Sequence, residues 1–203
     1  MELLSVTVEI MASPPESMWG VRSVHLIPLR ASKIETTGVP PGERSEMSGA
    51  DGTLVRIDSR LVHGQVAAAW VRAIGARRIV VANDEAAENP MRQRVMRMAV
   101  PQGVEVLFQT VPEAADTLRA LGGDPTLAVV ETPADALALV EAGVRPRAVN
   151  VGNLHMAAGK WRVAPAVAVD EGDCAALRAL RERGVEVVVR RTPLAPEGSL
   201  DWL

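Results

Sequence analysis

The sequence predicts an α/β fold: a single domain with a mainly parallel, seven-stranded sheet and helices on both faces. From residue 53 onward, short runs rich in β-branched residues recur, and helical stretches separate most of them. Strands that alternate with helices are joined by right-handed crossovers, so the strands lie parallel and helices cover the sheet. The runs are TLVRI, RRIVVAN, VEVLFQ, TLAVVE, AVNVG, AVAV and VEVVVR.

Apolar stripes and helix-end signals predict about five helices between these runs. An Asn-Pro pair begins at Asn89 and a Thr-Pro pair at Thr132, and both are typical of helix starts. The segment DEGDCAAL places carboxylates in the first turn of a later helix, and glycines end several helices or turns. Two stripes repeat every fourth residue and are expected to face the core: Val66, Trp70 and Ile74, and then Met91, Val95 and Ala99.

The composition changes near residue 50. Residues 11–52 carry five prolines among Ser, Thr, Gly and Glu and show weak periodicity, which is typical of a segment that buries little surface. We therefore expect residues 1–52 to form a poorly ordered N-terminal extension and residues 53–203 to form the domain. Met47 opens MSGADGTLVRID directly before the first strand, so it is an alternative translation start.

Composition argues against several classes of function. A net charge of −3, a pI near 5.7, one Phe and no Tyr argue against a nucleic-acid partner. No apolar run approaches the roughly 18 residues of a membrane span, and the first residues lack the basic start of a secretion signal. We expect a cytoplasmic protein. The single cysteine, Cys174, has acidic neighbours that would raise its thiol pKa, so it is expected to be an unreactive helix residue.

The commonest cofactor and hydrolase motifs are absent from the sequence. Neither GxGxxG nor GxxxxGK[ST] follows the first strand, and GxSxG does not occur. The three histidines lie far apart, and no His, Cys or carboxylate cluster has the spacing of metal ligands. No cofactor and no metal site is therefore predicted.

The segment RIDSRLVHGQV, residues 56–66, is the strongest candidate site. It spans the end of the first strand and the start of the first helix, where open parallel sheets bind ligands. His63 would lie at the helix start, where Gly64 allows close approach and free N–H groups favour an anion. Arg60 can bind phosphate oxygens through two parallel hydrogen bonds. From these residues alone, His63 is either a structural histidine or part of a phosphate site.

This segment resembles the active-site segment of the IIB components of the mannose/fructose/sorbose class of the bacterial sugar phosphotransferase system. Further segments resemble the family in the same order, from about residue 53 to 190: ANDEAAENPMRQRVMRMAVPQGV, VNVGNLHMAAGK and AVAVDEGD. The family's fold is a mainly parallel seven-stranded sheet flanked by helices. Two positions depart from the family pattern. Ser59 stands where a second aspartate is often found, and Asn153 stands where a second glycine is common.

The resemblance implies a role for each residue of the motif. His63 would accept a phosphoryl group from a phosphohistidine on a IIA protein or domain and pass it to a sugar bound by a membrane IIC/IID pair. Arg60 would offset charge on the oxygens in transit. Asp58 would orient Arg60 or the loop and would not act as a base. Gly64 and Gln65 would bind phosphate or support the loop, and no cofactor or metal is needed.

Other candidate residues have an ordinary structural alternative. Asn83 and Asp84 end the second strand and either line the same crevice or begin a helix. Thr132 either offers its hydroxyl to phosphate or caps a helix, and His155 is expected to be an exposed loop residue. One helix carries three arginines that either dock an acidic partner or form a solvated surface: Arg92, Arg94 and Arg97.

Three functions remain open at the level of the sequence. The chain is a phosphocarrier of a sugar transporter, a regulatory or binding protein of the same fold without a transporter, or an unrelated anion-binding domain with a structural His63. The expected partners are a IIA carrier, a membrane IIC/IID permease with which the chain associates peripherally, and a sugar that the family name does not identify. The sequence leaves a homodimer open.

Overall fold

The computed structural model describes residues 52–203, and every element below lies in that part of the chain. The predicted extension over residues 1–52 and the alternative start at Met47 lie outside the described residues, apart from Gly52. The elements in chain order are β1 (Thr53–Asp58), α1 (Gly64–Ile74), β2 (Arg78–Ala82), α2 (Asp84–Glu88), α3 (Pro90–Arg97), β3 (Glu105–Gln109), α4 (Val111–Leu121), β4 (Thr126–Val130), α5 (Pro133–Glu141), β5 (Ala148–Asn153), β6 (Trp161–Ala164), β7 (Val167–Val169), α6 (Glu171–Glu182) and β8 (Val187–Val189).

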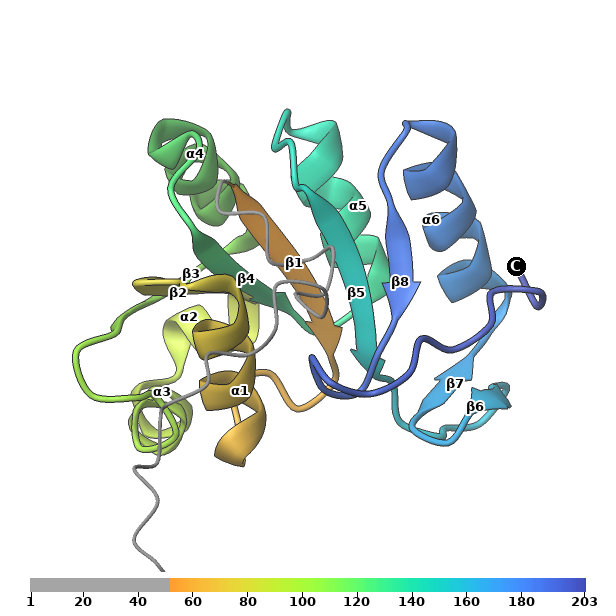
Figure 1. Cartoon of the computed structure of the whole chain (residues 1–203), viewed down its shortest axis with the longest axis horizontal. Coiled ribbons are helices and arrows are strands. Elements are labelled where there is room, and N and C mark those ends of the chain that lie inside the picture. Colours follow the sequence, from red (N-terminus) through yellow and green to blue (C-terminus); the bar gives the residue numbers. More distant parts are fainter. Residues whose placement is uncertain (1–51) are drawn as a thin grey trace, which may run out of the picture. The chain divides into compact units, whose positions relative to one another are not determined.

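The main sheet has six parallel strands in the order β3-β2-β4-β1-β5-β8. β1 therefore lies inside the sheet, between β4 and β5, and the carboxyl ends of the strands share one edge, which is the lower edge in Figure 1. The predicted parallel α/β fold is confirmed. The strand count of this sheet is one lower than predicted, because the run AVAV forms β7, which pairs with β6 in a separate antiparallel hairpin.

The β6–β7 hairpin is attached just beyond the carboxyl end of β5. The Leu154 N–H donates to the Ala166 carbonyl at 2.9 Å, and the Ala168 N–H donates to the Leu154 carbonyl at 3.0 Å. β6 was not predicted, because Trp161 and Arg162 are both exposed and the strand shows no alternation of buried and exposed residues. The hairpin consequently borders the sheet edge that holds the candidate site (Figure 1).

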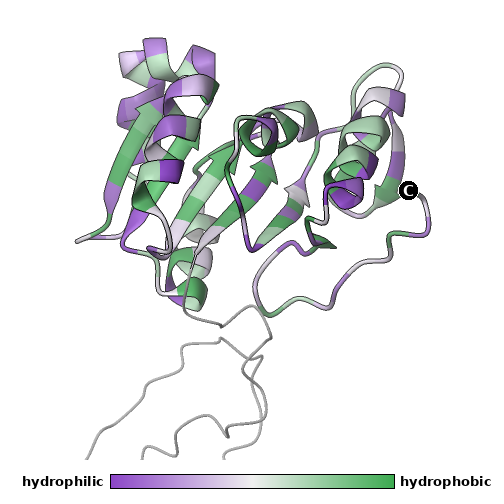
Figure 2. Ribbon diagram, turned by 90° about the horizontal axis from the view of Figure 1, so that it is seen from above, coloured by the Kyte–Doolittle hydropathy of each residue, from purple (hydrophilic) through white to green (hydrophobic). Residues whose placement is uncertain are grey.

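Each face of the sheet carries its own core, because alternate strand residues point to opposite sides. Val55 and Ile57 of β1 pack with residues of α4, α5 and α6, whereas Leu54 packs with residues of α1, α2 and α3. Helices therefore cover both faces, as predicted (Figure 1), and the strands between them are mostly hydrophobic in Figure 2. Burial on both faces explains why the strands appear in the sequence as nearly continuous apolar runs.

The predicted helix starts are confirmed by capping hydrogen bonds. The Asn89 side chain accepts from a backbone N–H in the first turn of α3. Thr132 and Asp135 form a reciprocal capping box at α5, and Asp170 and Asp173 form another at α6. The Asp173 backbone N–H holds the pKa of the Asp170 carboxyl below its ordinary value. The described part contains six helices, because the Asn-Pro pair separates two short ones, α2 and α3.

In the stripe predicted for α1, the two described side chains face the core, and the side chain of Val66 lies outside the described part. The stripe predicted for α3 points outward along the helix, although Ala99, which follows the helix, packs against the core. Trp70 and Ile74 are buried. Met91 and Val95, in contrast, are 67% and 62% exposed. α3 turns its other side inward: Met96 is buried, and the side-chain amide of a neighbouring glutamine donates to two carbonyl oxygens of α2 at 3.0 and 2.9 Å. Polar anchoring to α2 therefore overrides the apolar periodicity of this short helix.

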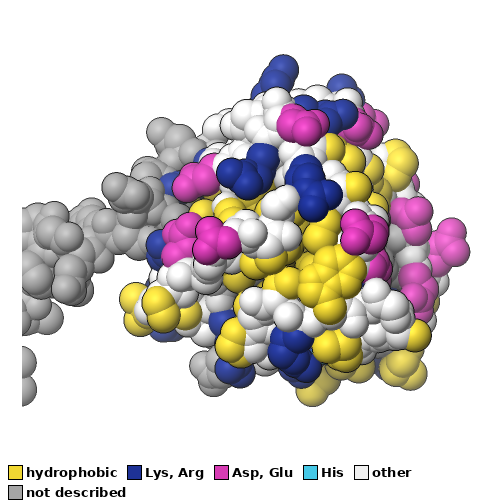
Figure 3. Space-filling model, turned by 90° about the vertical axis from the view of Figure 1, so that its right-hand side faces the viewer, with side chains coloured by type: hydrophobic (Ala, Val, Ile, Leu, Met, Phe, Trp, Pro, Cys, Tyr) yellow, Lys and Arg dark blue, Asp and Glu magenta, His cyan; other side chains and the backbone are white. Residues whose placement is uncertain are grey.

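The chain ends in an irregular segment that packs beside α6. The Gly198 N–H donates to the Val189 carbonyl of β8 at 2.8 Å, and Leu200, Trp202 and Leu203 pack against the core on that face. Figure 3 shows this side of the molecule, where apolar side chains gather between basic and acidic ones. Within residues 52–203, no helix is both long and apolar enough to cross a membrane.

Candidate active site

The candidate site lies at the carboxyl end of β1, where a short loop leads into α1 (Figure 1). His63 occupies the capping position of α1 with an extended backbone, φ −151° and ψ 146°, and its side chain makes no capping hydrogen bond. The imidazole is turned away from the helix and is 22% exposed. The side chain of His63 therefore leaves the N–H groups in the first turn of α1 available to an anion.

The loop before α1 has an unusual backbone on both sides of His63. Gly64 has a φ of +46°, a left-handed conformation that favours glycine, and a Cβ at this position would meet nothing within 4 Å. Leu61 also has a positive φ, +54°, although it is not a glycine. Left-handed backbone costs a non-glycine residue about 1–2 kcal/mol. At Gly64, backbone conformation and not lack of space therefore disfavours a larger residue.

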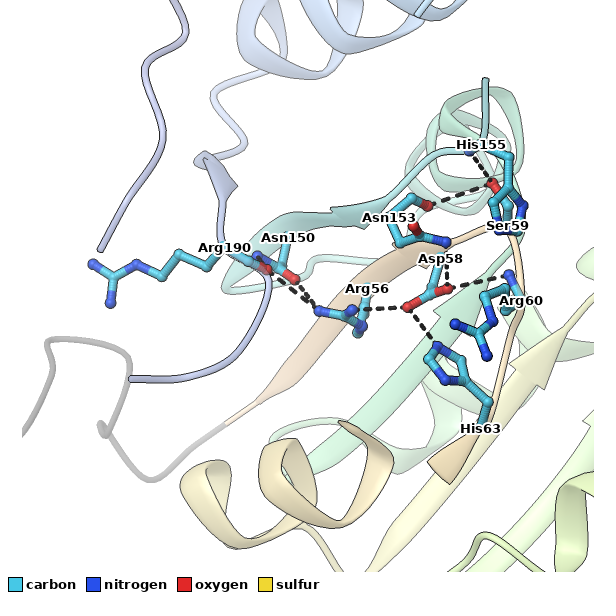
Figure 4. A network of polar contacts seen from close by, with 9 residues as sticks. All are labelled: Arg56, Asp58, Ser59, Arg60, His63, Asn150, Asn153, His155 and Arg190. Carbon is cyan, nitrogen blue, oxygen red and sulfur yellow. Dashed lines mark hydrogen bonds and ion pairs between the residues drawn. The ribbon is translucent and has the colours of Figure 1, made fainter. Parts of the chain in front are cut away.

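Asp58, the last residue of β1, is the centre of a buried polar network (Figure 4). Its side chain is fully buried. Oδ2 lies 2.8 Å from Arg56 Nη2 and 3.1 Å from His63 Nε2, while Oδ1 accepts from the Arg60 backbone N–H at 3.1 Å and from Asn153 Nδ2 at 3.2 Å. A carboxylate has about four acceptor sites, so these contacts use its full capacity.

This network fixes the tautomer of a neutral His63. An ionised carboxylate only accepts hydrogen bonds, so the hydrogen between His63 Nε2 and Asp58 Oδ2 belongs to Nε2. The other ring nitrogen, Nδ1, then carries the lone pair and is the nucleophilic atom of the ring. Asp58 was expected to orient Arg60 or the loop. It binds the backbone of Arg60 and the ring of His63, and no contact joins it to the Arg60 guanidinium.

Arg56 is a member of the site that sequence reasoning missed. It is 3% exposed, and besides Asp58 its guanidinium binds the Asn150 side-chain oxygen at 2.8 Å and the Arg190 carbonyl at 3.4 Å. Its Cζ atom also lies 5.4 Å from the centre of the Trp70 ring. Burial lowers the pKa of Arg56, and the charge of Asp58 counteracts part of this effect. The signal in the sequence was a charged residue inside an otherwise apolar strand.

Gly152 makes room for this guanidinium. A Cβ built on Gly152 would lie 2.1 Å from Arg56 Cζ, which no real structure tolerates. Gly152 belongs to β5 and adjoins Asn153, so the packing of β5 against β1 is what positions Arg56. The need for glycine here comes from this close approach and not from backbone conformation.

The two departures from the family pattern contact each other. The Ser59 N–H donates to the Asn153 carbonyl at 3.0 Å, and Ser59 Oγ donates to the same oxygen at 3.4 Å. Ser59 Oγ also accepts from the His155 N–H at 3.3 Å. Because the Asn153 amide donates to Asp58, the loop after β5 is joined to the network that holds His63 (Figure 4).

Two cavities meet at His63 and Arg60. The larger, which we call the polar cavity, has a volume of about 710 Å³ and includes the basic residues Arg162 and Arg191 together with His155. The smaller, the apolar cavity, has a volume of about 450 Å³. It is lined by Arg60, Val62, His63, Asn89, Met91, Arg92, Val95 and Met96. The imidazole can therefore be approached from two sides.

Three predicted candidates lie in helix-start turns, and none of them lines either cavity. Asn83 caps α2 and donates from Nδ2 to Glu131 at 2.8 Å. Asp84 accepts from the Val111 N–H at 2.8 Å, and Thr132 caps α5. The structure thus gives each of these polar groups a structural partner.

The remaining predicted residues divide between the site and its surroundings. Arg60 is exposed, and within the described chain its guanidinium has no ion-pair partner. His155 is exposed, as expected, and also lines the polar cavity. Gln65 is the second residue of α1, and its side chain lies outside the described part. Cys174 is buried in α6, and burial raises the pKa of its thiol, consistent with an unreactive residue.

The described residues contain no group of three or more His, Cys, Asp or Glu side chains that could hold a metal ion. The site combines an imidazole held by a buried carboxylate with a helix start and with Arg60, whose guanidinium has no ion-pair partner among residues 52–203. Such an arrangement suits nucleophilic attack on a phosphoryl group, because phosphoryl transfer depends mainly on positioning and charge stabilisation.

Comparison with known proteins gives a consistent result. Residues 52–203 match the family model of the PTS system sorbose subfamily IIB component. The chain is 46% identical over 144 residues to the N-acetylgalactosamine-specific phosphotransferase enzyme IIB component 2 of Escherichia coli. The matched region covers 70% of this chain and 92% of that protein. It is 36% identical over 149 residues to the E. coli mannose-specific EIIAB component, covering 71% of this chain but 45% of that protein.

Solved structures agree with the sequence matches. The N-acetylgalactosamine-specific IIB component 1 of E. coli superposes with a TM-score of 0.69 at 33% identity, covering 72% of this chain and 97% of that one. The IIBSor domain of the Klebsiella pneumoniae sorbose permease superposes with a TM-score of 0.67 at 30% identity, covering 72% and 91%. The chain therefore belongs to the IIB components of the mannose/fructose/sorbose class of the phosphotransferase system, a family of phosphotransferases in sugar transport.

Proposed function

We propose that this chain is a phosphocarrier that accepts a phosphoryl group on His63 and passes it to a sugar during transport. The observation that carries this proposal is the hydrogen bond of 3.1 Å between His63 Nε2 and the buried Asp58 carboxylate. It presents Nδ1 as the nucleophile at the start of α1, in a chain whose family transfers phosphoryl groups.

In the first step, the Nδ1 lone pair of His63 attacks the phosphorus of a phosphohistidine on a IIA protein. A new N–P bond forms as the donor's N–P bond breaks, and the bonding electrons return to the donor imidazole. During transfer, the negative oxygens of the phosphoryl group face the Arg60 guanidinium and the N–H groups of α1. Asp58 offsets the positive charge that His63 gains when Nδ1 bonds to phosphorus. No cofactor or metal ion takes part in this proposal.

In the second step, a sugar hydroxyl attacks the phosphorus on His63. The N–P bond breaks, its electrons return to Nδ1, and the hydroxyl proton leaves to the imidazole or to solvent. A membrane IIC/IID pair would hold the sugar, with this chain in the cytoplasm and associated peripherally with that pair. The relative at 46% identity is named for N-acetylgalactosamine, so this sugar is the first to test.

The relative named EIIAB supports the assignment of the donor. This chain covers 45% of that protein, so the relative contains a further segment, and its name combines IIA with IIB. We infer that a IIA protein or domain is the direct donor for His63. The residues proposed to act are His63 and Arg60, with Asp58, Asn153 and Arg56 as positioning residues.

Phosphotransfer from a purified donor tests this function. Radiolabelled phosphoenolpyruvate, the general phosphotransferase proteins and a matching IIA should label the chain at one acid-labile, base-stable site. His63→Ala should abolish the label, whereas the matched control His155→Ala, a histidine that lines the same polar cavity, should retain it. Labelling of His63→Ala at the wild-type level would refute the proposal.

A second measurement separates a transporter component from a regulatory phosphoprotein. Membranes that contain the IIC and IID proteins should phosphorylate N-acetylgalactosamine or another sugar only when the labelled chain is added. Labelling of His63 without transfer to any sugar would favour the regulatory alternative instead.

A further inference from the structure

An apolar ridge on α3 lies exposed beside the candidate site. Met91, Val95 and Met98 are 67%, 62% and 84% exposed. Their spacing of four and three residues places them on one face of the helix and its last turn. We call these three residues the α3 ridge. Single exposed apolar residues are common, but a contiguous set of them marks an interaction site more often than chance.

The ridge cannot turn inward, because the opposite side of α3 is already engaged. Met96 is buried among residues of α1 and β2. The Gln93 side-chain amide donates to the carbonyl oxygens of Ala86 and Ala87 in α2 at 3.0 and 2.9 Å. Rotating the helix to bury the ridge would break both hydrogen bonds and expose Met96. The ridge is therefore a settled feature of the folded domain.

The ridge is continuous with the reactive histidine. Met91 and Val95 line the apolar cavity together with Arg60 and His63. A protein that delivers a phosphoryl group must bring the phosphorus on its own phosphohistidine within bonding reach of His63 Nδ1. Its surface around that imidazole then covers whatever adjoins His63 on the side of approach. An apolar centre with a basic rim is typical of such a protein interface.

Polarity, and not charge, favours the donor over the sugar-binding partner on this side, because basic residues border both cavities. Arg60 and Arg94 are exposed at the ridge and suit a donor that carries a negative phosphoryl group. Arg92 also lines the apolar cavity but is paired with Glu85 at 2.9 Å. The polar cavity on the other side of His63 offers the hydrogen-bonding groups that a sugar needs. In the apolar cavity, the side chain of Asn89 caps α3 and Arg92 is held by its ion pair, so fewer such groups remain there.

We propose that the α3 ridge is the docking surface for the phosphorylated IIA donor, which approaches His63 over the apolar cavity. This inference rests on the proposed function. A second copy of the chain on the ridge would cover the apolar cavity and close one approach to His63, so the ridge is assigned to the transient donor and not to a dimer.

The test compares a ridge variant with a matched control. The double variant Met91→Ser and Val95→Ser removes the apolar surface at exposed positions, so the domain should still fold. Leu194→Ser removes an apolar side chain that is 96% exposed and lines neither cavity. Each chain is phosphorylated in two ways: by phospho-IIA, and by phosphoramidate, a small donor that needs no docking surface.

The ridge variant should show a KM for phospho-IIA transfer raised about tenfold or more, as for loss of hot-spot contacts. Its labelling by phosphoramidate, and both reactions of Leu194→Ser, should remain at the wild-type level. A wild-type KM in the ridge variant would overturn the docking surface while the proposed function stands. A defect of the ridge variant that is confined to transfer from His63 to sugar would also overturn the docking surface. The same holds if sedimentation shows that the wild-type chain is a dimer and the ridge variant a monomer. Failure of both donors to label the wild-type chain would instead refute the proposed function, and the docking surface with it.

Discussion

Replacing Gly152 with alanine is expected to destabilise the protein by displacing the Arg56 guanidinium. The new Cβ would lie 2.1 Å from Arg56 Cζ and 2.2 Å from each terminal nitrogen. Unbonded carbon atoms normally approach no closer than about 3.5 Å, so the guanidinium has to move by more than about 1 Å. Its hydrogen bond to Asp58 is now 2.8 Å long, and such bonds weaken beyond about 3.2 Å.

The expected cost follows from the burial of this ion pair. Arg56 and Asp58 have 4% and 0% exposed side chains. Breaking a buried pair by removing one partner costs about 3–5 kcal/mol, a large share of the roughly 5–15 kcal/mol that stabilises a typical domain. With a urea dependence of about 2 kcal/mol per molar, the unfolding midpoint should fall by about 2 M. The corresponding fall in Tm is roughly 10 °C.

Urea unfolding followed by circular dichroism measures this change, and Gly123→Ala is the matched control. A Cβ on Gly123 would meet nothing within 4 Å, and its φ is not left-handed. The free energy of unfolding of Gly123→Ala should therefore stay within about 0.5 kcal/mol of the wild-type value. Equal midpoints for Gly152→Ala and Gly123→Ala would refute the reasoning, because they would show that the guanidinium is not confined between β1 and β5.

Four further outcomes are expected. Asp58→Asn should slow donor labelling of His63 by at least about tenfold, since an amide can donate to Nε2 and leave the proton on Nδ1; an unchanged initial rate would contradict this role. Asn153→Gly should slow the same labelling by a smaller factor, because it removes one of the two hydrogen bonds to Asp58 Oδ1; a larger effect than that of Asp58→Asn would reverse the expected order. Thr132→Ala should lower the free energy of unfolding by about 1 kcal/mol through loss of the helix cap while labelling is unchanged, and lost labelling would place Thr132 at the phosphate. The pKa of the Cys174 thiol is raised by burial, so the thiol contributes stability that is complete below the ordinary thiol pKa of about 8.5. This stability declines as pH rises, because the thiol ionises first in the unfolded chain. Unfolding curves of Cys174→Ala should lack this alkaline decline, and an identical decline in both chains would exclude the thiol as its cause.

The architecture was predictable from the sequence because both faces of the sheet are buried. All seven predicted runs form strands, and the predicted caps at Asn89 and Thr132 are present. The exception is the hairpin: the AVAV run has the composition of a core strand, but its partner β6 is exposed at Trp161 and Arg162. Apolar composition indicates that a strand is buried but does not indicate its hydrogen-bonding partner. The prediction therefore placed this strand in the wrong sheet.

The candidate site was predictable only where its residues are adjacent in the sequence. His63, Arg60 and Asp58 lie in one segment, and the structure brings them together. Arg56 and Asn153 were not predicted as parts of this network, because their contacts depend on β5 lying beside β1. Asn83, which was a candidate because of its position, lies at the end of β2, where its side chain caps α2 and donates to Glu131.

The stacking of Arg56 on Trp70 also supplies an optical reporter. Trp70 is 1% exposed, so its emission is expected at the short wavelengths of a buried indole, and the charged guanidinium lies 5.4 Å from the centre of its ring. Arg56 in turn binds Asp58, which binds His63. Any charge placed on His63 is therefore two hydrogen-bonded side chains from the indole. With the other tryptophans replaced by phenylalanine, intrinsic fluorescence would follow each arrival and departure of a phosphoryl group in real time, without an attached dye.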